Sequence, residues 1–192
     1  MNISDVTACL VTRGDLPLAA ILQEIRAAGI EDVQVYDNSR EPNEAVYGRY
    51  LAIARAKHAV VFTQDDDCVV PAASIRALIA ARQPGEIAAS MPARFWPHYP
   101  DSCLLGFGAC FGRELPEQAF ARFEAWRRKA LRPGDRRVRP DVIFTALTPH
   151  RKLELPVEIL PAASAPGRMY RQQGHSRQRQ RVLEHARRAR AA

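Results

Sequence analysis

Hydrophobic and polar positions in the first third of the chain follow two different periods. Apolar runs at 6–12, 33–36 and 59–62 are rich in β-branched residues, which is typical of strands buried on both faces. Segment 18–25 repeats apolar residues every three or four positions, as an amphipathic helix does, and 45–57 is expected to form a second helix. The resulting order of strand, helix, strand, helix, strand predicts an α/β fold with a mostly parallel central sheet flanked by helices.

The later elements are expected from turn residues as well as from apolar patterning. Asp15 can cap the first helix, and Gly29 can end it. Segment 92–100 holds three prolines and three aromatic residues, so we expect an irregular loop there. Gly106 and Gly108 interrupt a strand-like run and permit close approach of a ligand or of another backbone. Further helices are expected from Pro71 to Pro84, from Pro116 to Ala130, from Asp141 onward and from Arg177 to Ala191, with strands at 87–91 and 157–160.

Length and composition favour a single domain in a reducing compartment. The chain has 192 residues, 47% of them hydrophobic, which is enough to bury a core. We expect the domain to span 1–167, followed by a loop and a basic helix at 168–192. The four cysteines form no CxxC pair, which indicates neither a disulfide framework nor a zinc site and favours the cytoplasm. No apolar stretch approaches the ~20 residues of a membrane span, and the N-terminus lacks a secretion-signal pattern.

The net charge of +7 is concentrated at the end of the chain. Residues 168–192 hold eight arginines and one glutamate, which accounts for the whole excess. A second basic cluster, 122–139, is offset by acidic residues elsewhere. Clustered arginines suit phosphates, either in a small dianion or in a nucleic-acid backbone. The alternative is a solvated helix face that only keeps the protein soluble.

Three consecutive aspartates, Asp65, Asp66 and Asp67, follow the apolar run at 59–62. Like charges this close repel one another, and a divalent cation removes that cost. Carboxylate oxygens are the preferred ligands of Mg²⁺ and Mn²⁺, and ligands of open α/β sheets bind beyond the carboxyl ends of strands. The aspartates therefore predict a metal site. The alternative is a polar turn in which an aspartate caps the next helix.

The segment around these aspartates resembles the nucleotide-binding half of the GT-A glycosyltransferases, which use nucleotide-diphosphate sugars. The matching residues are Gly48-Arg49-Tyr50, then Ala56, then Val60 to Gln64 followed by Asp65-Asp66-Asp67. Arg49 and Asp65 stand 16 residues apart, in agreement with the family's arginine helix and Asp-x-Asp motif. The resemblance implies a GT-A fold in which 1–67 is the nucleotide-binding part and 87–167 the acceptor part.

The resemblance also implies roles for individual residues. Asp67 would be a direct ligand of Mn²⁺ or Mg²⁺, and Asp65 would contact the ribose or a metal-bound water. The donor would be a nucleotide-diphosphate sugar, expected to be a UDP-sugar. Its other contacts would come from Thr12 and Arg13 beside the base, Asp37 on the nucleoside, Arg49 near the base or pyrophosphate, and Asp66 on the sugar. From the residues alone, Asp37 could instead be a turn former and Arg49 a helix-surface residue.

Two features nearer the end would complete such a site. GT-A enzymes often supply a second metal ligand from a late loop, and His175 matches it, with Arg168 and Arg171 clamping the pyrophosphate. Asp141, at an expected helix start, would be the base that deprotonates the acceptor hydroxyl of an inverting enzyme. The alternatives are an exposed histidine and an ordinary helix-cap aspartate. A retaining mechanism would not need this base.

The sequence thus favours a metal-dependent glycosyltransferase in the cytoplasm of a bacterial or phage-infected host cell. The basic clusters and the aromatic segment 95–99 suggest a phosphate-bearing acceptor, such as a hydroxymethylated pyrimidine in DNA, as in bacteriophage DNA modification. A duplex base would have to be flipped out to react. A nucleotidyltransferase is a second enzyme class, although segment 12–15 is too short and too acidic for its usual glycine-rich loop. A non-catalytic nucleic-acid-binding protein would leave the aspartates unexplained.

Overall fold

The computed structural model describes residues 2–127, 139–161 and 175–191. Its main strands are β1 (Val6–Thr12), β2 (Asp32–Asp37), β3 (Val60–Gln64), β5 (Ile87–Ser90), β6 (Ala109–Gly112) and β7 (His150–Leu153). Within the described residues they form one six-stranded sheet in the order β2-β1-β3-β6-β5-β7. β6 runs antiparallel to β3 and β5, and the other neighbouring pairs are parallel. The predicted α/β fold with a mostly parallel sheet is confirmed, and it is consistent with a Rossmann-like architecture.

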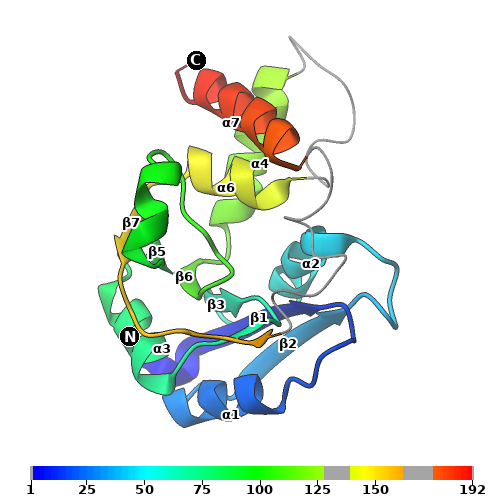
Figure 1. Ribbon diagram of the computed structural model, residues 1–192, viewed down its shortest axis with the longest axis vertical. Helices are drawn as coiled ribbons and strands as arrows, with labels where there is room; N and C mark the ends of the chain where they lie inside the picture. The colour runs from blue at the N-terminus through cyan, green and yellow to red at the C-terminus, as the bar shows by residue number, and fades with distance from the viewer. Residues whose placement is uncertain (1, 128–138, 162–174, 192) are drawn as a thin grey trace.

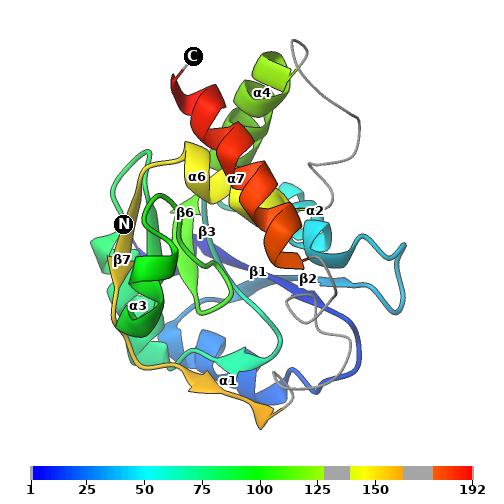
Figure 2. The ribbon, with the colours of Figure 1, turned by 45° about the horizontal axis from the view of Figure 1, so that its top comes forward.

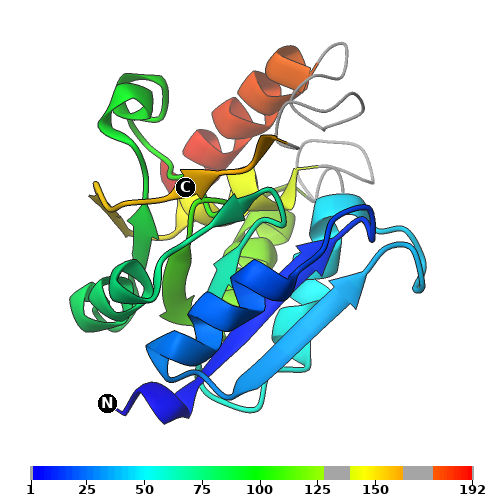
Figure 3. The same cartoon turned by 60° about the horizontal axis from the view of Figure 1, so that its bottom comes forward.

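Helices cover both faces of this sheet (Figures 1 and 3). The α-helices are α1 (Ala19–Ala28), α2 (Gly48–Ala54), α3 (Ala72–Ala81), α4 (Leu115–Arg127), α6 (Pro140–Leu147) and α7 (His175–Ala191). The short 3₁₀ helices are η1 (Ile3–Asp5), η2 (Ala45–Tyr47) and η3 (Ala93–His98). α1 and α3 pack on one face, whereas α2, α4 and α6 belong to the opposite side. A separate two-stranded sheet pairs β4 (Cys68–Val69) with β8 (Glu158–Ile159).

The two faces of the sheet hold two hydrophobic clusters, which explains why the strand patterns are continuously apolar. All seven residues of β1 are buried. Ala8 and Leu10 pack with Ile21 of α1, and the intervening Cys9 belongs to the cluster that includes Phe120 of α4. Successive side chains of a strand point to opposite faces, so a strand covered on both sides has no polar positions to alternate.

Helix α7 is packed into the fold despite its arginine content. Its Val182, Leu183, Ala186 and Ala189 are buried in the same cluster as the sheet residues of that face. Figure 2 shows α7 lying across α6, with α4 behind it. The buried side chains recur at the helical period, which gives this polar helix one narrow apolar stripe. The predicted basic helix is therefore part of the hydrophobic core on that face of the sheet.

Most of the predicted elements are present with small shifts of their ends. Gly29 ends α1 with a φ of 101°, in the left-handed region that glycine adopts without strain. The helix expected from Pro71 is α3, and Ile75 and Leu78 are fully buried in it. Segment 92–100 contains η3 instead of an entirely irregular loop. The strand expected at 157–160 is β8, shortened to two residues.

Three local predictions were wrong or incomplete. Asp15 does not cap α1, because the helix begins at Ala19 with Leu18 at its N-cap, and Asp15 instead pairs with Arg13 at 3.5 Å. The strand-like run before β6 becomes extended only at Ala109, because Gly108 has a φ of 98°. The edge strand β7 was not predicted, since its sequence His-Arg-Lys-Leu carries no apolar period.

None of the helices in the described ranges has the length and apolar character that crossing a bilayer would require.

The packing of α7 can be tested by shortening one buried side chain. Leu183→Ala should lower the free energy of unfolding by about 2–4 kcal/mol, because it removes buried methyl groups and leaves a cavity. Arg188→Ala, on the exposed side of the same helix, should change it by less than about 0.5 kcal/mol. Urea denaturation of both variants measures the difference. Equal small changes would mean that α7 is not part of the folded core.

Candidate active site

The candidate site lies at the carboxyl ends of three adjacent parallel strands. Thr12, the last residue of β1, is the register partner of Asp37, the last residue of β2. β3 ends at Gln64, beside β1, and the aspartates follow in the turn that leads to β4. The carboxyl ends of these strands thus meet at one edge, which is where open α/β sheets bind ligands.

Asp66 ties the ends of β1 and β3 together. It is 5% exposed, and its Oδ2 accepts hydrogen bonds from the Thr12 hydroxyl at 2.9 Å and from the Arg13 backbone N–H at 3.2 Å. The Thr12 hydroxyl in turn accepts from the Gly14 backbone N–H at 3.0 Å. These bonds fix the loop after β1 against the aspartate turn, so Thr12, Arg13 and Asp66 form one hydrogen-bonded unit.

Asp37 shapes the neighbouring turn. Its Oδ1 accepts hydrogen bonds from the Ser39 backbone N–H at 2.9 Å and from the Ser39 hydroxyl at 2.7 Å. These bonds lower the pKa of the Asp37 carboxyl below its ordinary value, and Arg40 at 3.4 Å adds to the effect. A side chain on Gly14 would collide with Ser39, so the loops after β1 and β2 are closely packed. Asp37 therefore forms a turn at the site edge.

Arg49 is the central group of the site. It is fully buried, and it reaches two carboxylates that are far apart in sequence. Its Nη2 donates to Oδ1 of Asp65, and its Nη1 donates to Oδ2 of Asp141 at 3.0 Å. Burial alone would lower the pKa of Arg49, but Asp141 and Asp65 raise it well above the ordinary value. The guanidinium is thus a permanent cation, and the helix-surface alternative for Arg49 is wrong.

Asp141 is held by two donors from α2. Its other oxygen, Oδ1, accepts from the Tyr50 hydroxyl at 2.7 Å. Burial raises the pKa of the Asp141 carboxyl above its ordinary value, while Arg49 and the Tyr50 hydrogen bond oppose that rise. Arg139, not Asp141, is the N-cap residue of α6. The side chain of Asp141 remains 29% exposed, so a reactant could reach it.

Gly106 makes room for Asp65. The Asp65 backbone N–H donates to the Gly106 carbonyl at 2.9 Å, and a Cβ on Gly106 would collide with the Asp65 carboxylate. The side chain of Asp65 is 43% exposed. The expected close approach at this glycine is therefore to the aspartate turn, which it allows to sit directly against the loop before β6.

The aspartate turn offers hard oxygen donors on a fixed backbone. The Asp67 carbonyl accepts from the Leu160 N–H at 2.9 Å, next to the β4–β8 pair. No aspartate caps α3, whose first N–H instead donates to Glu24 of α1 at 2.7 Å. In the part of the chain that the structure describes, no group of three or more His, Cys, Asp or Glu side chains is arranged to hold a metal. Mg²⁺ takes one or two carboxylates and completes its shell with water and phosphate, so Asp65 and Asp67 are the residues of this turn whose chemistry would suit such an ion.

The other predicted site residues lie wholly or partly outside the residues that the structure describes. Arg168 and Arg171 lie outside the described residues, as does the side chain of His175, whose backbone opens α7. Arg139, at the start of α6, donates to Gln178 in the first turn of α7 at 2.9 Å. The beginning of α7 is therefore attached to the helix that carries Asp141.

Comparison of the sequence with models of known protein families found no match, and comparison with curated proteins found none either. The chemistry of this site is therefore the basis from which a function is inferred.

Sequence reasoning missed Tyr50 as a site residue and missed the direct pairing of Arg49 with Asp141. Tyr50 adjoins Arg49 in sequence, but on a helix a neighbouring position points in a different direction. One signal could have indicated both. Arg49 and Tyr50 lie on a helix that connects two predicted parallel strands, and such a helix must pack one side against the sheet. Their acidic partner lies in another part of the sequence, and no local pattern identifies it.

The bridging role of Arg49 predicts a large effect on stability. Arg49→Gln should lower the free energy of unfolding by about 3 kcal/mol, because Asp65 and Asp141 lose their shared cation; this is the low end for a broken buried pair, since both carboxylates keep some exposure. Arg49→Lys should recover only part of the loss, because one ammonium does not replace a two-armed guanidinium.

The matched control is Arg55→Gln, just after the same helix, where the ion pair with Glu41 is at the surface. That change should cost less than about 1 kcal/mol. Urea denaturation at neutral pH compares the variants. Similar losses at both positions would contradict the bridging role of Arg49.

Proposed function

We propose that this protein is a metal-dependent glycosyltransferase of the GT-A type, which moves a sugar from a nucleotide-diphosphate sugar, expected to be a UDP-sugar, to an acceptor hydroxyl. A hydroxymethylated pyrimidine in DNA is one acceptor of suitable chemistry. The observation that carries the proposal is the convergence of Asp65 and Asp141 on Arg49. One carboxylate directly follows a parallel strand, and the other lies in the first turn of a helix from the far half of the chain.

The edge formed by β1, β2 and β3 supports a nucleotide-binding role. Its loops are fixed by the hydrogen bonds of Asp66 and Asp37, so few groups need to be ordered when a ligand binds. Thr12 and Arg13 would lie beside the base, and Asp37 beside the nucleoside. Because Asp66 is hydrogen-bonded to Thr12 and Arg13, its proposed role is to hold the loop after β1, which would contact the donor.

Asp65 and Asp67 would hold Mn²⁺ or Mg²⁺, which when bound would neutralise charge on the departing diphosphate. Arg49 balances the local excess of negative charge before any ligand arrives. Arg168, Arg171 and His175 remain proposed partners of the metal and the pyrophosphate.

Asp141 is proposed as the general base. The Tyr50 hydroxyl and Arg49 fix both of its oxygens, so the carboxylate is oriented before the acceptor binds. A base works best when its pKa lies closer to the working pH than that of a free aspartate, and burial shifts Asp141 in that direction. It would accept the hydroxyl proton as the acceptor oxygen attacks the sugar.

Donor binding tests the metal site directly. Wild-type protein should be stabilised against heat by a UDP-sugar in the presence of Mn²⁺, because a ligand that binds only the folded state stabilises it by mass action. Asp67→Asn should abolish this shift while the protein stays folded. Asp65→Asn should abolish it too, but at a lower melting temperature without ligand, because this change also removes the ion pair with Arg49. Asp5→Asn, an exposed aspartate in η1, is the control and should leave the shift unchanged. A donor-induced thermal shift that persists in both site variants would contradict the proposed metal site.

The base assignment makes a prediction about pH. The rate should rise with pH through a pKa above the ordinary aspartate value, because only the ionised Asp141 accepts a proton. Tyr50→Phe removes a hydrogen bond that lowers this pKa, so the rising limb should move to higher pH. Asp141→Asn should reduce kcat about 10²–10⁴-fold. Initial rates of donor consumption between pH 4 and 9 provide the measurement, and an unshifted limb in Tyr50→Phe would remove Asp141 as the titrating group.

A further inference from the structure

Three exposed arginines form a row along α7. Arg177, Arg181 and Arg188 are spaced four and seven residues apart, so they lie on one side of the helix over about 16 Å. The buried residues Val182, Ala186 and Ala189 face the opposite side. Glu184, which accepts from Gln180 at 3.1 Å, is the one acidic residue of α7 in the described part of the chain. The outward side of α7 is therefore strongly positive. We call these three arginines the arginine row.

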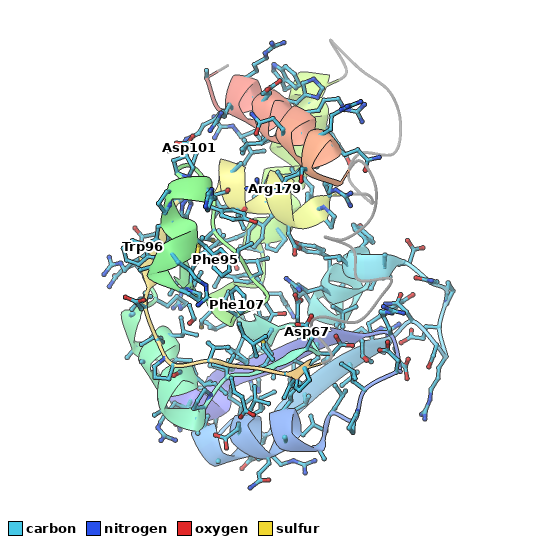
Figure 4. The ribbon with its side chains drawn as sticks, in the orientation of Figure 1. Asp67, Phe95, Trp96, Asp101, Phe107 and Arg179 are labelled. Carbon is cyan, nitrogen blue, oxygen red and sulfur yellow. The ribbon has the colours of Figure 1, made fainter. Side chains whose placement is uncertain are left out.

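An aromatic pair lies beside the candidate active site. The rings of Phe95 and Phe107 are stacked, with centroids 5.8 Å apart and planes 13° from parallel. The guanidinium of Arg94 lies 4.9 Å from the centre of the Phe95 ring. Phe107 follows Gly106, whose backbone touches Asp65, and Figure 4 draws it between Phe95 and Asp67. Both rings are only partly buried, so part of their surface is accessible.

Cationic side chains fasten the aromatic segment to α7. Arg179 lies over the ring of Tyr99, 4.0 Å from its centre, and Arg187 donates to Asp101 at 2.6 Å. Lys152 of β7 donates to the Tyr99 carbonyl. Figure 4 shows Arg179 and Asp101 on the side of α7 that faces η3. The arginine row and the aromatic pair are thus carried by one connected structural unit.

We propose that this unit binds a nucleic-acid strand, with phosphates on the arginine row and an unstacked base on the Phe95–Phe107 pair. Guanidinium groups suit phosphates, and a base stacks on an aromatic ring without regard to its identity. The biological role of this surface rests on the proposed function: a strand bound there would bring the hydroxyl of a base beside Asp65 and Asp141. Binding itself requires neither donor nor metal.

The chemistry of the surface favours nucleic acid over two other anionic partners. A lipid surface would call for large apolar side chains among the arginines, yet within the described residues the exposed large hydrophobic residues are Trp96 and Ile159, neither of them on α7. An acidic peptide would match the charge but gives the aromatic pair no planar ring to hold. A nucleic-acid strand uses both features.

The test is binding of a fluorescently labelled single-stranded DNA oligonucleotide, followed by anisotropy over a range of salt concentrations without donor or metal. Arg177→Gln/Arg181→Gln/Arg188→Gln should weaken binding at least tenfold and flatten the dependence of log affinity on log salt by about 2, because up to three phosphate contacts are lost. Phe95→Leu/Phe107→Leu should weaken binding about tenfold at unchanged salt slope, because stacking releases no counterions.

The control removes the same charge elsewhere. Arg26→Gln/Arg76→Gln/Arg151→Gln changes three exposed arginines of α1, α3 and β7, and it should alter the affinity less than threefold. An equal loss in the control and in the arginine row would overturn the proposed surface and indicate general charge attraction. Unaltered affinity in the phenylalanine variant would overturn the base platform. Stronger binding to phosphatidylserine vesicles than to DNA, lost in the row variant, would assign the surface to a membrane instead.

Two further measurements separate this proposal from the proposed function. Circular dichroism melting must show that each variant is folded, and a variant that does not fold is replaced by single substitutions at the same positions. Donor-induced thermal shift should be intact in the arginine-row variant. If wild-type protein binds DNA through this surface but never binds a nucleotide sugar, the glycosyltransferase proposal fails while the nucleic-acid surface stands. If it binds the sugar donor but not DNA, the reverse holds.

Discussion

The structure depends most on one buried guanidinium placed between two carboxylates. Arg49 has no solvent exposure, so its charge can exist only because Asp65 and Asp141 neutralise it. The carboxylates in turn stand at the start of the aspartate turn and at the start of α6. The two ion pairs of Arg49 therefore join the aspartate turn to the start of α6. The same contacts concentrate charge where a ligand could reach it.

This arrangement reduces a conflict inherent in the sequence. Three adjacent aspartates repel one another, and the fold deals with each of them separately. Asp66 turns inward onto Thr12 and Arg13, Asp65 pairs with Arg49, and Asp67 lies beside the β4–β8 pair. Only part of the negative charge is left for an external cation. The loops that carry these aspartates are thus held in place by hydrogen bonds and ion pairs of the protein itself, and the proposed transferase is based on this arrangement.

Helix α7 combines two roles that composition alone would separate. An excess of arginine suggests a solvated tail, but a stripe of small and branched apolar residues seats the helix against α4 and α6. Arg179 and Arg187 then face inward to hold Tyr99 and Asp101, leaving the arginine row on the outside. The division of arginines between inward and outward positions follows from the helical period, because residues one or two positions apart on a helix, such as Arg187 and Arg188 or Arg179 and Arg181, point in different directions.

The sequence by itself determined the α/β class, the strands that end in Thr12 and Asp37, the strand that precedes Asp65, and most of the helices, because apolar period and turn chemistry are local properties. It also placed the aspartates at a strand end. Tertiary structure decided that Arg49 is buried, that Tyr50 and Arg49 share Asp141, and that Gly106 fits against Asp65. It also decided that β7 is a strand and that Asp15 caps nothing. These outcomes depend on which distant segments of the chain come into contact. The energies of those contacts cannot be derived from any one local segment of the sequence.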